Sequence, residues 1–163
     1  MRLVFLLLLS FQSVANNIDK RPHYIFLTTP AETQHKKTDP PLSQCGRLRA
    51  QHLSTLLSYS NIQSVYSTTN LSAMETANPI AKKNKIPVKI FIDNLLDSLA
   101  ITVIKEDKNV LIVANNDKIR FLVEFISQQE LSKSQEHNQH LLYQITLLDG
   151  HKILTVLKQP LKC

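Results

Sequence analysis

Short apolar runs that favour β-strands alternate with segments of helical periodicity along most of the chain. Residues 24–27 are apolar and are followed by two threonines and a proline, a pattern that predicts a buried strand over 24–28 leading into a loop. Similar runs cover residues 62–67, 86–92 and 109–114. The last of these is a nearly continuous apolar run, which is typical of a strand buried on both faces of a parallel sheet.

Four helices are predicted between and after these strands. Ser43 can cap the first helix, which carries an apolar stripe on one face. The second is expected to begin at Thr69 or Asn70 and to end near Lys83, and the third is a short helix around residues 94–102. The fourth contains four apolar residues at helical spacing: Ile119, Leu122, Val123 and Ile126.

Asp149-Gly150 joins two β-rich runs near the end of the chain. A two-residue Asp-Gly connection between such runs is a strong signal for a β-hairpin. Strands that alternate with helices form mostly parallel sheets with helices on both faces. The predicted fold class is therefore α/β: a three-layer α/β/α sandwich with a mostly parallel sheet and a C-terminal β-hairpin.

The first fifteen residues have the composition of a secretory signal peptide. A basic start at Arg2 precedes a short apolar run, and small residues stand at Ser13 and Ala15, where a signal peptidase reads the chain. The apolar run is too short to span a bilayer comfortably. We expect cleavage after Ala15, a single domain over residues 16–163 without membrane association, and a periplasmic or secreted location.

Two cysteines, Cys45 and Cys163, are present in the sequence. An exported protein can keep a disulfide, so a bridge between them is one possibility. The interpretation that the sequence favours is a free, half-buried Cys45 and a free thiol at the end of the chain.

The formal net charge of +6 does not indicate nucleic-acid binding. The basic residues are scattered, without a stripe interleaved with aromatic residues, and most of them fit solvated helix faces. Gly46 and Gly150 are the only glycines, and they are too far apart for a phosphate cradle. His137 and His140 lie three residues apart, but without a carboxylate or cysteine at ligand spacing we expect neither a metal nor another cofactor.

Ligands of α/β sheets bind beyond the carboxyl ends of the parallel strands. Two segments are expected there: Thr29-Pro30 after the first strand, and Asn115-Asn116 after the strand at 109–114. None of these side chains is a catalytic acid, base or charged group. The residues alone therefore predict a binding region without evident catalytic chemistry.

Four segments carry a resemblance to a known family. The first pattern, a strand followed by an Arg-His-Ala/Gly-Glu turn, is similar to YIFLTTPAET. The second, a helix start with Pro-Leu-x-x-x-Gly, is similar to DPPLSQCGRLRAQHLSTLL. The third pattern, a Val-Tyr-Ser segment followed by Arg and Thr-Ala-x-Pro, resembles IQSVYSTTNLSAMETANPIA. The fourth, a valine-rich strand ending in Gly-His-Ser-Asn, resembles NVLIVANNDKIRFLV. In this order and spacing, the segments resemble the histidine phosphatase superfamily, which has the phosphoglycerate mutase-like fold, and especially its short exported members.

The resemblance implies which positions would be catalytic. In active members a histidine of the first turn attacks phosphorus, while two arginines and a second histidine surround the phosphoryl group. Carried over, the first arginine falls on Thr29, the nucleophile on Pro30, the second arginine on Ser72 and the second histidine on Asn115. The acidic residue of the turn is retained as Glu32. The implied pocket therefore lacks the catalytic groups, and it consists of Thr29, Pro30, Glu32, Ser72, Asn115 and Asn116.

Covalent phosphoryl transfer needs a nucleophile and positive charge around the phosphoryl oxygens. Pro30 supplies no nucleophile, so we predict a non-catalytic exported relative, a pseudoenzyme that acts as a binding or scaffold protein for an unknown small molecule or protein. The alternative is a phosphohydrolase, acting on phosphomonoesters or phosphohistidine, with a rearranged site that uses His35 or Asp117. A third possibility is a decaying gene product without a present function.

Overall fold

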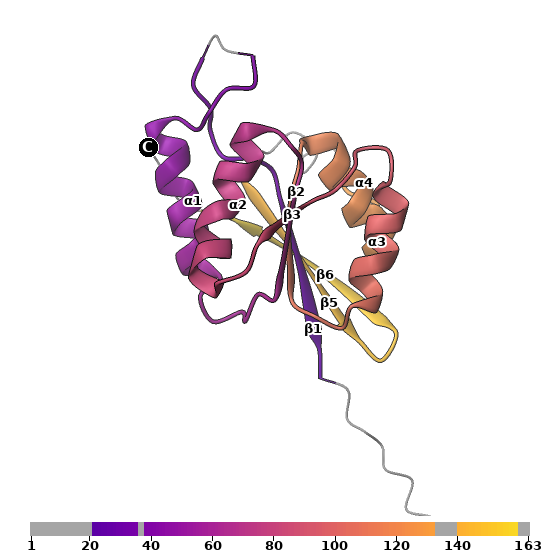
Figure 1. Cartoon of the computed structure of the whole chain (residues 1–163). Coiled ribbons are helices and arrows are strands. Elements are labelled where there is room, and N and C mark those ends of the chain that lie inside the picture. The colour runs from indigo at the N-terminus through magenta and orange to yellow at the C-terminus, as the bar shows by residue number, and fades with distance from the viewer. Residues whose placement is uncertain (1–20, 36–37, 133–139, 160–163) are drawn as a thin grey trace, which may run out of the picture.

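The computed structural model describes residues 21–35, 38–132 and 140–159. These residues form three layers, in which one sheet lies between two pairs of helices (Figure 1). The predicted three-layer α/β/α fold is confirmed. The predicted signal peptide, His137 and Cys163 lie outside the described residues.

The helices and strands follow one another in the predicted alternating order. In chain order they are β1 (His23–Thr28), α1 (Gln44–Leu56), β2 (Ser64–Ser67), α2 (Leu71–Asn84), β3 (Val88–Ile90), α3 (Leu96–Lys105), β4 (Val110–Val113), α4 (Asn116–Ser127), β5 (Leu141–Leu148) and β6 (His151–Lys158). β2, β3 and β4 are shorter than predicted, and α3 both begins and ends later than predicted. The reason for the short β3 is that it lies at the sheet edge and pairs only with β2, over three residues.

Across the described sheet the strand order is β3-β2-β4-β1-β5-β6. The first four strands in this order are parallel to their neighbours, and β5 and β6 add on in antiparallel fashion. Val113 at the end of β4 is opposite Thr28 on one side and Ser67 on the other. The carboxyl ends of β1, β2 and β4 therefore meet at one edge of the sheet.

The C-terminal hairpin is formed as predicted. β5 and β6 pair along their whole lengths, from Leu141 with Lys158 to Leu148 with His151. Asp149 and Gly150 connect them with φ angles of 49° and 80°. Positive φ at both positions is what a two-residue turn with the right-handed twist of the strands requires.

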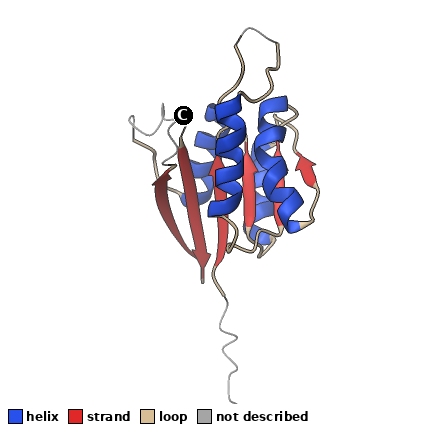
Figure 2. Cartoon of the chain, turned by 90° about the vertical axis from the view of Figure 1, so that its left-hand side faces the viewer, coloured by secondary structure: helices blue, strands red, loops and turns tan. Residues whose placement is uncertain are grey.

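Helices cover both faces of the sheet (Figures 1 and 2), and a large hydrophobic cluster lies on each face. Alternate residues of a strand point to opposite faces. Phe26 of β1 accordingly packs in the cluster with Leu53 of α1, while Ile25 packs in the cluster with Ile119 of α4. All four residues of β4 are buried, as the apolar run of that strand predicts. The four apolar residues of the fourth helix are buried as well.

The first helix begins as predicted, and the second begins at the predicted Asn70 but takes its cap from elsewhere. The Ser43 hydroxyl accepts a hydrogen bond from the Gly46 N–H at 3.0 Å and so caps α1. Asn70 occupies the N-cap position of α2 but makes no capping hydrogen bond with its side chain. Instead, Asp39 Oδ1 accepts from the Leu71 N–H at 2.8 Å. The cap of α2 therefore comes from a distant loop.

Cys45 lies in the first turn of α1 and is disulfide-bonded. The interpretation favoured by the sequence, a free Cys45, is therefore wrong. A disulfide depends on which distant segments meet, and local sequence patterns do not contain that information. Among the described helices, none combines the length and the apolar character needed to cross a membrane.

Candidate functional site

A cavity of about 290 Å³ lies at the carboxyl ends of the parallel strands. We call it the carboxyl-end cavity. It is lined by Thr29, Pro30, Ala31, Glu32, Thr33, Ser72, Asn115 and Asn116. All six residues predicted for the pocket from the sequence thus line one cavity, and Ala31 and Thr33 of the first turn join them.

Three segments that are distant in the sequence bring these side chains together. The turn after β1 forms one wall, and Ser72 is in the first turn of α2. Asn115 is the N-cap of α4, which begins at Asn116. Two helix N-termini, with the positive ends of their dipoles, therefore lie beside the cavity.

The Glu32 carboxylate is held by a buried arginine of α1. Arg49 Nε lies 2.9 Å from each oxygen of the Glu32 carboxylate, and the Arg49 side chain is almost entirely buried. The Arg49 hydrogen bonds hold the pKa of Glu32 below its usual value, against the opposing effect of burial. His140 adds to this cluster, since its Nδ1 lies 3.8 Å from Glu32 Oε1. Glu32 is therefore a fixed ion-pair partner and is poorly suited to act as a proton donor.

The backbone of the first turn is fixed by contacts with both neighbouring helices. The Ser43 N–H donates to the Glu32 carbonyl at 2.8 Å. The Ala31 N–H donates to Thr76 Oγ1 at 3.0 Å, and the same hydroxyl donates to the Ser72 carbonyl at 2.7 Å. The turn that lines the cavity is therefore tied to α1 on one side and to α2 on the other.

The end of β1 is also fixed by the antiparallel strands β5 and β6 and the residue that follows them. The Thr28 hydroxyl donates to the Leu141 carbonyl at 2.9 Å, and the Gln159 side-chain amide donates to the same hydroxyl at 3.3 Å. The Gln159 N–H in turn donates to the His140 carbonyl at 2.8 Å. The start of β5 and the end of β6 therefore help to position the first turn.

Sequence reasoning missed three of these supporting residues: Arg49, Thr76 and Gln159. One signal was available for Arg49, because it stands between Leu48 and Ala50 on a helix and four residues before the buried Leu53. A charged residue at such a spacing can be buried only with a partner. No comparable local signal distinguishes Thr76 or Gln159 from other polar residues.

The described lining of the carboxyl-end cavity contains no histidine, cysteine, lysine or arginine. His35 and Asp117, the candidates for a rearranged site, are both exposed, and neither lines the cavity. Within the described ranges, no group of three or more histidine, cysteine or acidic side chains could hold a metal ion. The cavity offers hydroxyl and amide groups that donate and accept hydrogen bonds.

The chain matches the sequence profile of the histidine phosphatase superfamily (branch 1) over residues 28–97. This range contains the first turn, α1, and α2 with Ser72. No curated protein matches the chain in sequence.

Solved structures share the fold of the chain. The protein histidine phosphatase SixA complexed with tungstate aligns with a TM-score of 0.67 and 13% identity, over 83% of this chain and 96% of that chain. The mycobacterial glucosyl-3-phosphoglycerate phosphatase Rv2419c aligns at 0.64 and 13%, over 85% and 99%. A phosphoserine phosphatase mutant from Entamoeba histolytica in complex with phosphoserine aligns at 0.64 and 16%, over 82% and 95%. At these identities the likeness establishes the fold.

Proposed function

Because residues 28–97 of this chain match the profile of the histidine phosphatase superfamily, we propose that it is a non-catalytic, exported member of that superfamily that binds a neutral polar ligand in the carboxyl-end cavity. The observation that carries the proposal is Pro30. In the correspondence with the family, Pro30 occupies the position of the nucleophilic histidine. A proline ring has no atom that can attack phosphorus, and its nitrogen has no N–H to offer a phosphoryl oxygen.

The charge in the cavity supports the same conclusion. Thr29, Ser72 and Asn115 stand where active members have two arginines and a histidine. They can donate hydrogen bonds but carry no charge, whereas a transferring phosphoryl group needs cations aimed at its oxygens. Loss of one such donor typically lowers the rate by about 10²–10³. Replacement of all three catalytic groups together with the nucleophile leaves no route for covalent phosphoryl transfer.

A neutral polar ligand suits this lining better than a phosphate. Hydroxyl and amide groups can both donate and accept hydrogen bonds, so they complement a ligand with hydroxyl or amide groups of its own. The Glu32 carboxylate adds negative charge to the lining, and Arg49 balances part of it from outside the cavity. A phosphate would meet Glu32 without a cation on the cavity surface.

Export is supported by two separate features. Residues 1–15 have the pattern of a signal peptide, and Cys45 is disulfide-bonded. Disulfides persist in the periplasm and outside the cell, and they are rare in the cytosol. N-terminal sequencing of the protein from an exporting host is expected to begin at Asn16. A mature protein that still begins at Met1 would contradict export with cleavage.

A second candidate is a phosphohydrolase with a rearranged site. The observation in its favour is that solved structures of similar fold carry phosphatase names, including SixA, a protein histidine phosphatase. One histidine beside the first turn is His140, whose Nδ1 lies 3.8 Å from Glu32 Oε1. A phosphohydrolase would need this residue, or His35, to move into the cavity.

The test is turnover of p-nitrophenyl phosphate by the purified protein and by three variants prepared in the same way: Asn115→Ala, His35→Ala and His140→Ala. We expect every rate to equal that of buffer. Turnover that survives purification and is abolished by Asn115→Ala would contradict the proposal. Turnover that is equal in all four proteins would come from a contaminating enzyme, because the cavity variant would not affect it.

Calorimetry with tungstate tests the charge argument separately. A cavity lined by hydroxyl, amide and carboxylate groups, without a cation, should give no binding heat with this phosphate-like anion. Tungstate binding that Asn115→Ala weakens would show that the cavity still recognises a phosphoryl-shaped anion, and it would favour the second candidate.

A further inference from the structure

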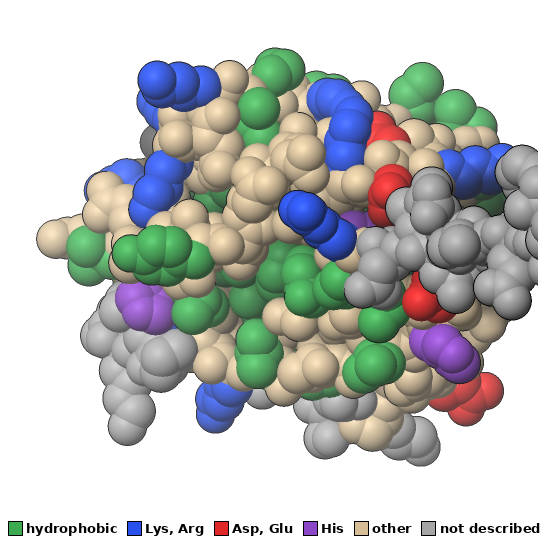
Figure 3. Space-filling model, turned by 90° about the horizontal axis from the view of Figure 1, so that it is seen from below, with side chains coloured by type: hydrophobic (Ala, Val, Ile, Leu, Met, Phe, Trp, Pro, Cys, Tyr) green, Lys and Arg blue, Asp and Glu red, His purple; other side chains and the backbone are tan. Residues whose placement is uncertain are grey.

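A second cavity, of about 340 Å³, opens at the opposite end of the sheet. We call it the amino-end cavity. It lies among the start of β1, the end of α3 and the β5–β6 turn. Figure 3 looks onto this end of the molecule and shows hydrophobic side chains gathered at its centre, with basic, histidine and acidic side chains around them. The function proposed above makes no use of this cavity.

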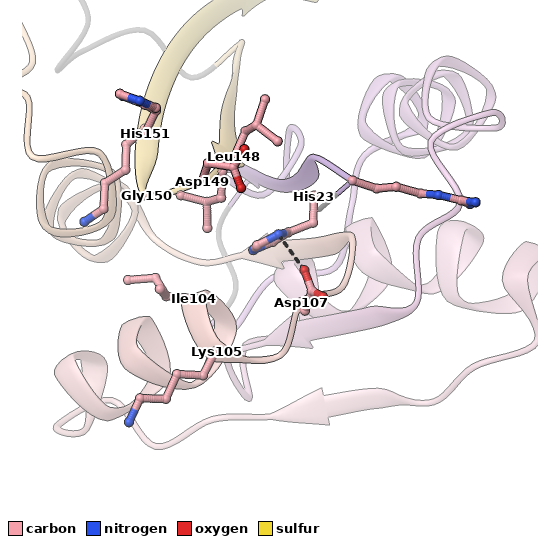
Figure 4. Close-up of a pocket in the computed structure, with 11 residues that line it drawn as sticks. His23, Ile104, Lys105, Asp107, Leu148, Asp149, Gly150 and His151 are labelled. Atoms are coloured by element: carbon pink, nitrogen blue, oxygen red, sulfur yellow. Dashed lines mark ion pairs between the residues drawn. The ribbon is translucent and has the colours of Figure 1, made fainter. Parts of the chain in front are cut away.

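His23 is the polar group at the centre of the amino-end cavity. Its Nδ1 lies 3.0 Å from Asp107 Oδ1, and its side chain is only 15% exposed. In Figure 4 the other edge of the imidazole ring is turned into the cavity, toward Ile104 and Gly150. The Nε2 atom on that edge is buried and has no hydrogen-bond partner in the described structure. A buried polar atom without a partner calls for an explanation, and an absent ligand is one.

The apolar part of the lining can hold a hydrocarbon group. Ile104, Leu147 and Leu148 contribute aliphatic side chains to the cavity. Leu147 is buried, while Ile104 and Leu148 are partly open to the cavity and to solvent. Covering aliphatic surface of this kind with an apolar ligand group is favourable. A cavity of this size is at the small end of the usual range for ligand sites.

The charged part of the lining favours an anion. Asp107 is already paired with His23. The remaining charged residues are one carboxylate and three cations: Asp149, Arg21, Lys105 and Lys152. When the imidazole of His23 is protonated, both ring nitrogens are donors, Nδ1 to Asp107 and Nε2 to an oxygen in the cavity.

We propose that the amino-end cavity binds a small organic anion with an apolar body and one carboxylate. The apolar body lies against Ile104, Leu147 and Leu148. The carboxylate accepts a hydrogen bond from His23 Nε2 and is attracted by the lysines at the rim. The site is independent of the carboxyl-end cavity, because the length of β1 separates the two by roughly 20 Å.

The test is titration calorimetry of the purified protein with three probes of equal chain length: octanoate, octanol and octylamine. We expect octanoate to bind at least about tenfold more tightly than the neutral or the cationic probe, since one charge-assisted hydrogen bond has about that value. His23→Gln and Lys105→Glu should each weaken octanoate binding by about tenfold. Ser72→Ala, in the other cavity, is the matched control and should leave it unchanged.

The proposal would be overturned by no heat with octanoate, by equal binding of octylamine, or by loss of octanoate binding in Ser72→Ala. Circular dichroism of each variant establishes that it is folded. If His23→Gln fails to fold, Lys105→Glu decides, because Lys105 is exposed at the end of α3 and its substitution leaves the core intact. Octanoate affinity that is unchanged in a folded Lys105→Glu variant would also contradict the proposal.

Discussion

Gly46 lies where α1 packs closely against the first turn. A Cβ at this position would lie 2.0 Å from the carbonyl oxygen of Glu32. The atom in the way belongs to the backbone of the turn that lines the carboxyl-end cavity, so it cannot rotate aside. The absence of a side chain at Gly46 therefore allows the turn to pack against the helix.

We expect Gly46→Ala to lower the free energy of unfolding by about 2 kcal/mol or more, because the turn must move away from α1. Urea unfolding followed by circular dichroism measures the change. Gln51→Ala is the matched control: it is an exposed position of the same helix, and it should stay within about 0.5 kcal/mol of the native protein. A loss of stability at Gly46 no larger than at Gln51 would show that the turn adapts freely.

The ion pair of Glu32 and Arg49 is the second residue-scale determinant of the turn. Glu32→Gln would leave the buried guanidinium of Arg49 without its charge partner, so we expect a loss of about 2 kcal/mol at pH 7. Asp93→Asn is the control, because Asp93 pairs with Lys118 from an exposed position. Exposed pairs contribute at most about 1 kcal/mol.

The same pair should make stability depend on pH. The pKa of Glu32 in the folded protein lies below its usual value of 4.5 because of Arg49. A carboxylate with a lowered pKa stabilises the fold above its unfolded pKa, and this contribution is lost as the pH falls through the folded value. Denaturant titrations from pH 7 down to pH 3 should show the native protein and Glu32→Gln converging below pH 4.5. A difference between them that stays constant over this range would contradict the assignment.

At the scale of elements, the two helices that border the cavity begin in different ways. α1 is capped locally by Ser43, whereas α2 is capped by Asp39 from the loop between β1 and α1. Asp39 adopts a φ of 51°, a conformation that aspartate tolerates better than most residues. The distant cap connects the loop before α1 to the helix that carries Ser72.

We therefore expect Asp39→Ala to destabilise the protein by about 1 kcal/mol, and Asn70→Ala by only a few tenths. The second substitution is the matched control, because Asn70 is the N-cap residue of the same helix and makes no side-chain capping bond. Thermal unfolding of the two variants measures the difference. Equal effects, or a larger effect at Asn70, would show that the local N-cap residue and not the loop stabilises the start of α2.

At the scale of the whole molecule, the disulfide at Cys45 is the feature most directly open to test. Before reduction, the protein is expected to show no thiol that reacts with a thiol reagent, whether the protein is native or denatured. Removal of a native disulfide usually costs about 2–5 kcal/mol, so reduction should lower the thermal midpoint. A reactive thiol in the denatured, non-reduced protein would contradict the bond.

The succession of elements could be predicted almost completely from the sequence, since the patterns behind it are local. The four strands and the hairpin follow from runs of apolar residues and from Asp149-Gly150, and the helices from apolar spacing. The first and last residues of each strand could be predicted less precisely, because strand ends depend on the partner strand. β3 stops after three residues for this reason. The six residues of the predicted pocket also lie together, because parallel strands bring their carboxyl ends to one edge.

By itself, then, the sequence determined the order of helices and strands, the faces they bury and the edge of the sheet at which a cavity forms. Only the tertiary structure decided what holds that cavity in shape. Glu32 pairs with Arg49, which lies 17 positions away in the sequence. Asp39 caps α2 at Leu71 from 32 positions away, and Thr76 accepts a hydrogen bond from Ala31 over 45 positions. The physical reason is that periodicity and turn preferences act between neighbours in the chain. Ion pairs, distant caps and disulfides join groups whose proximity exists only after the layers have packed.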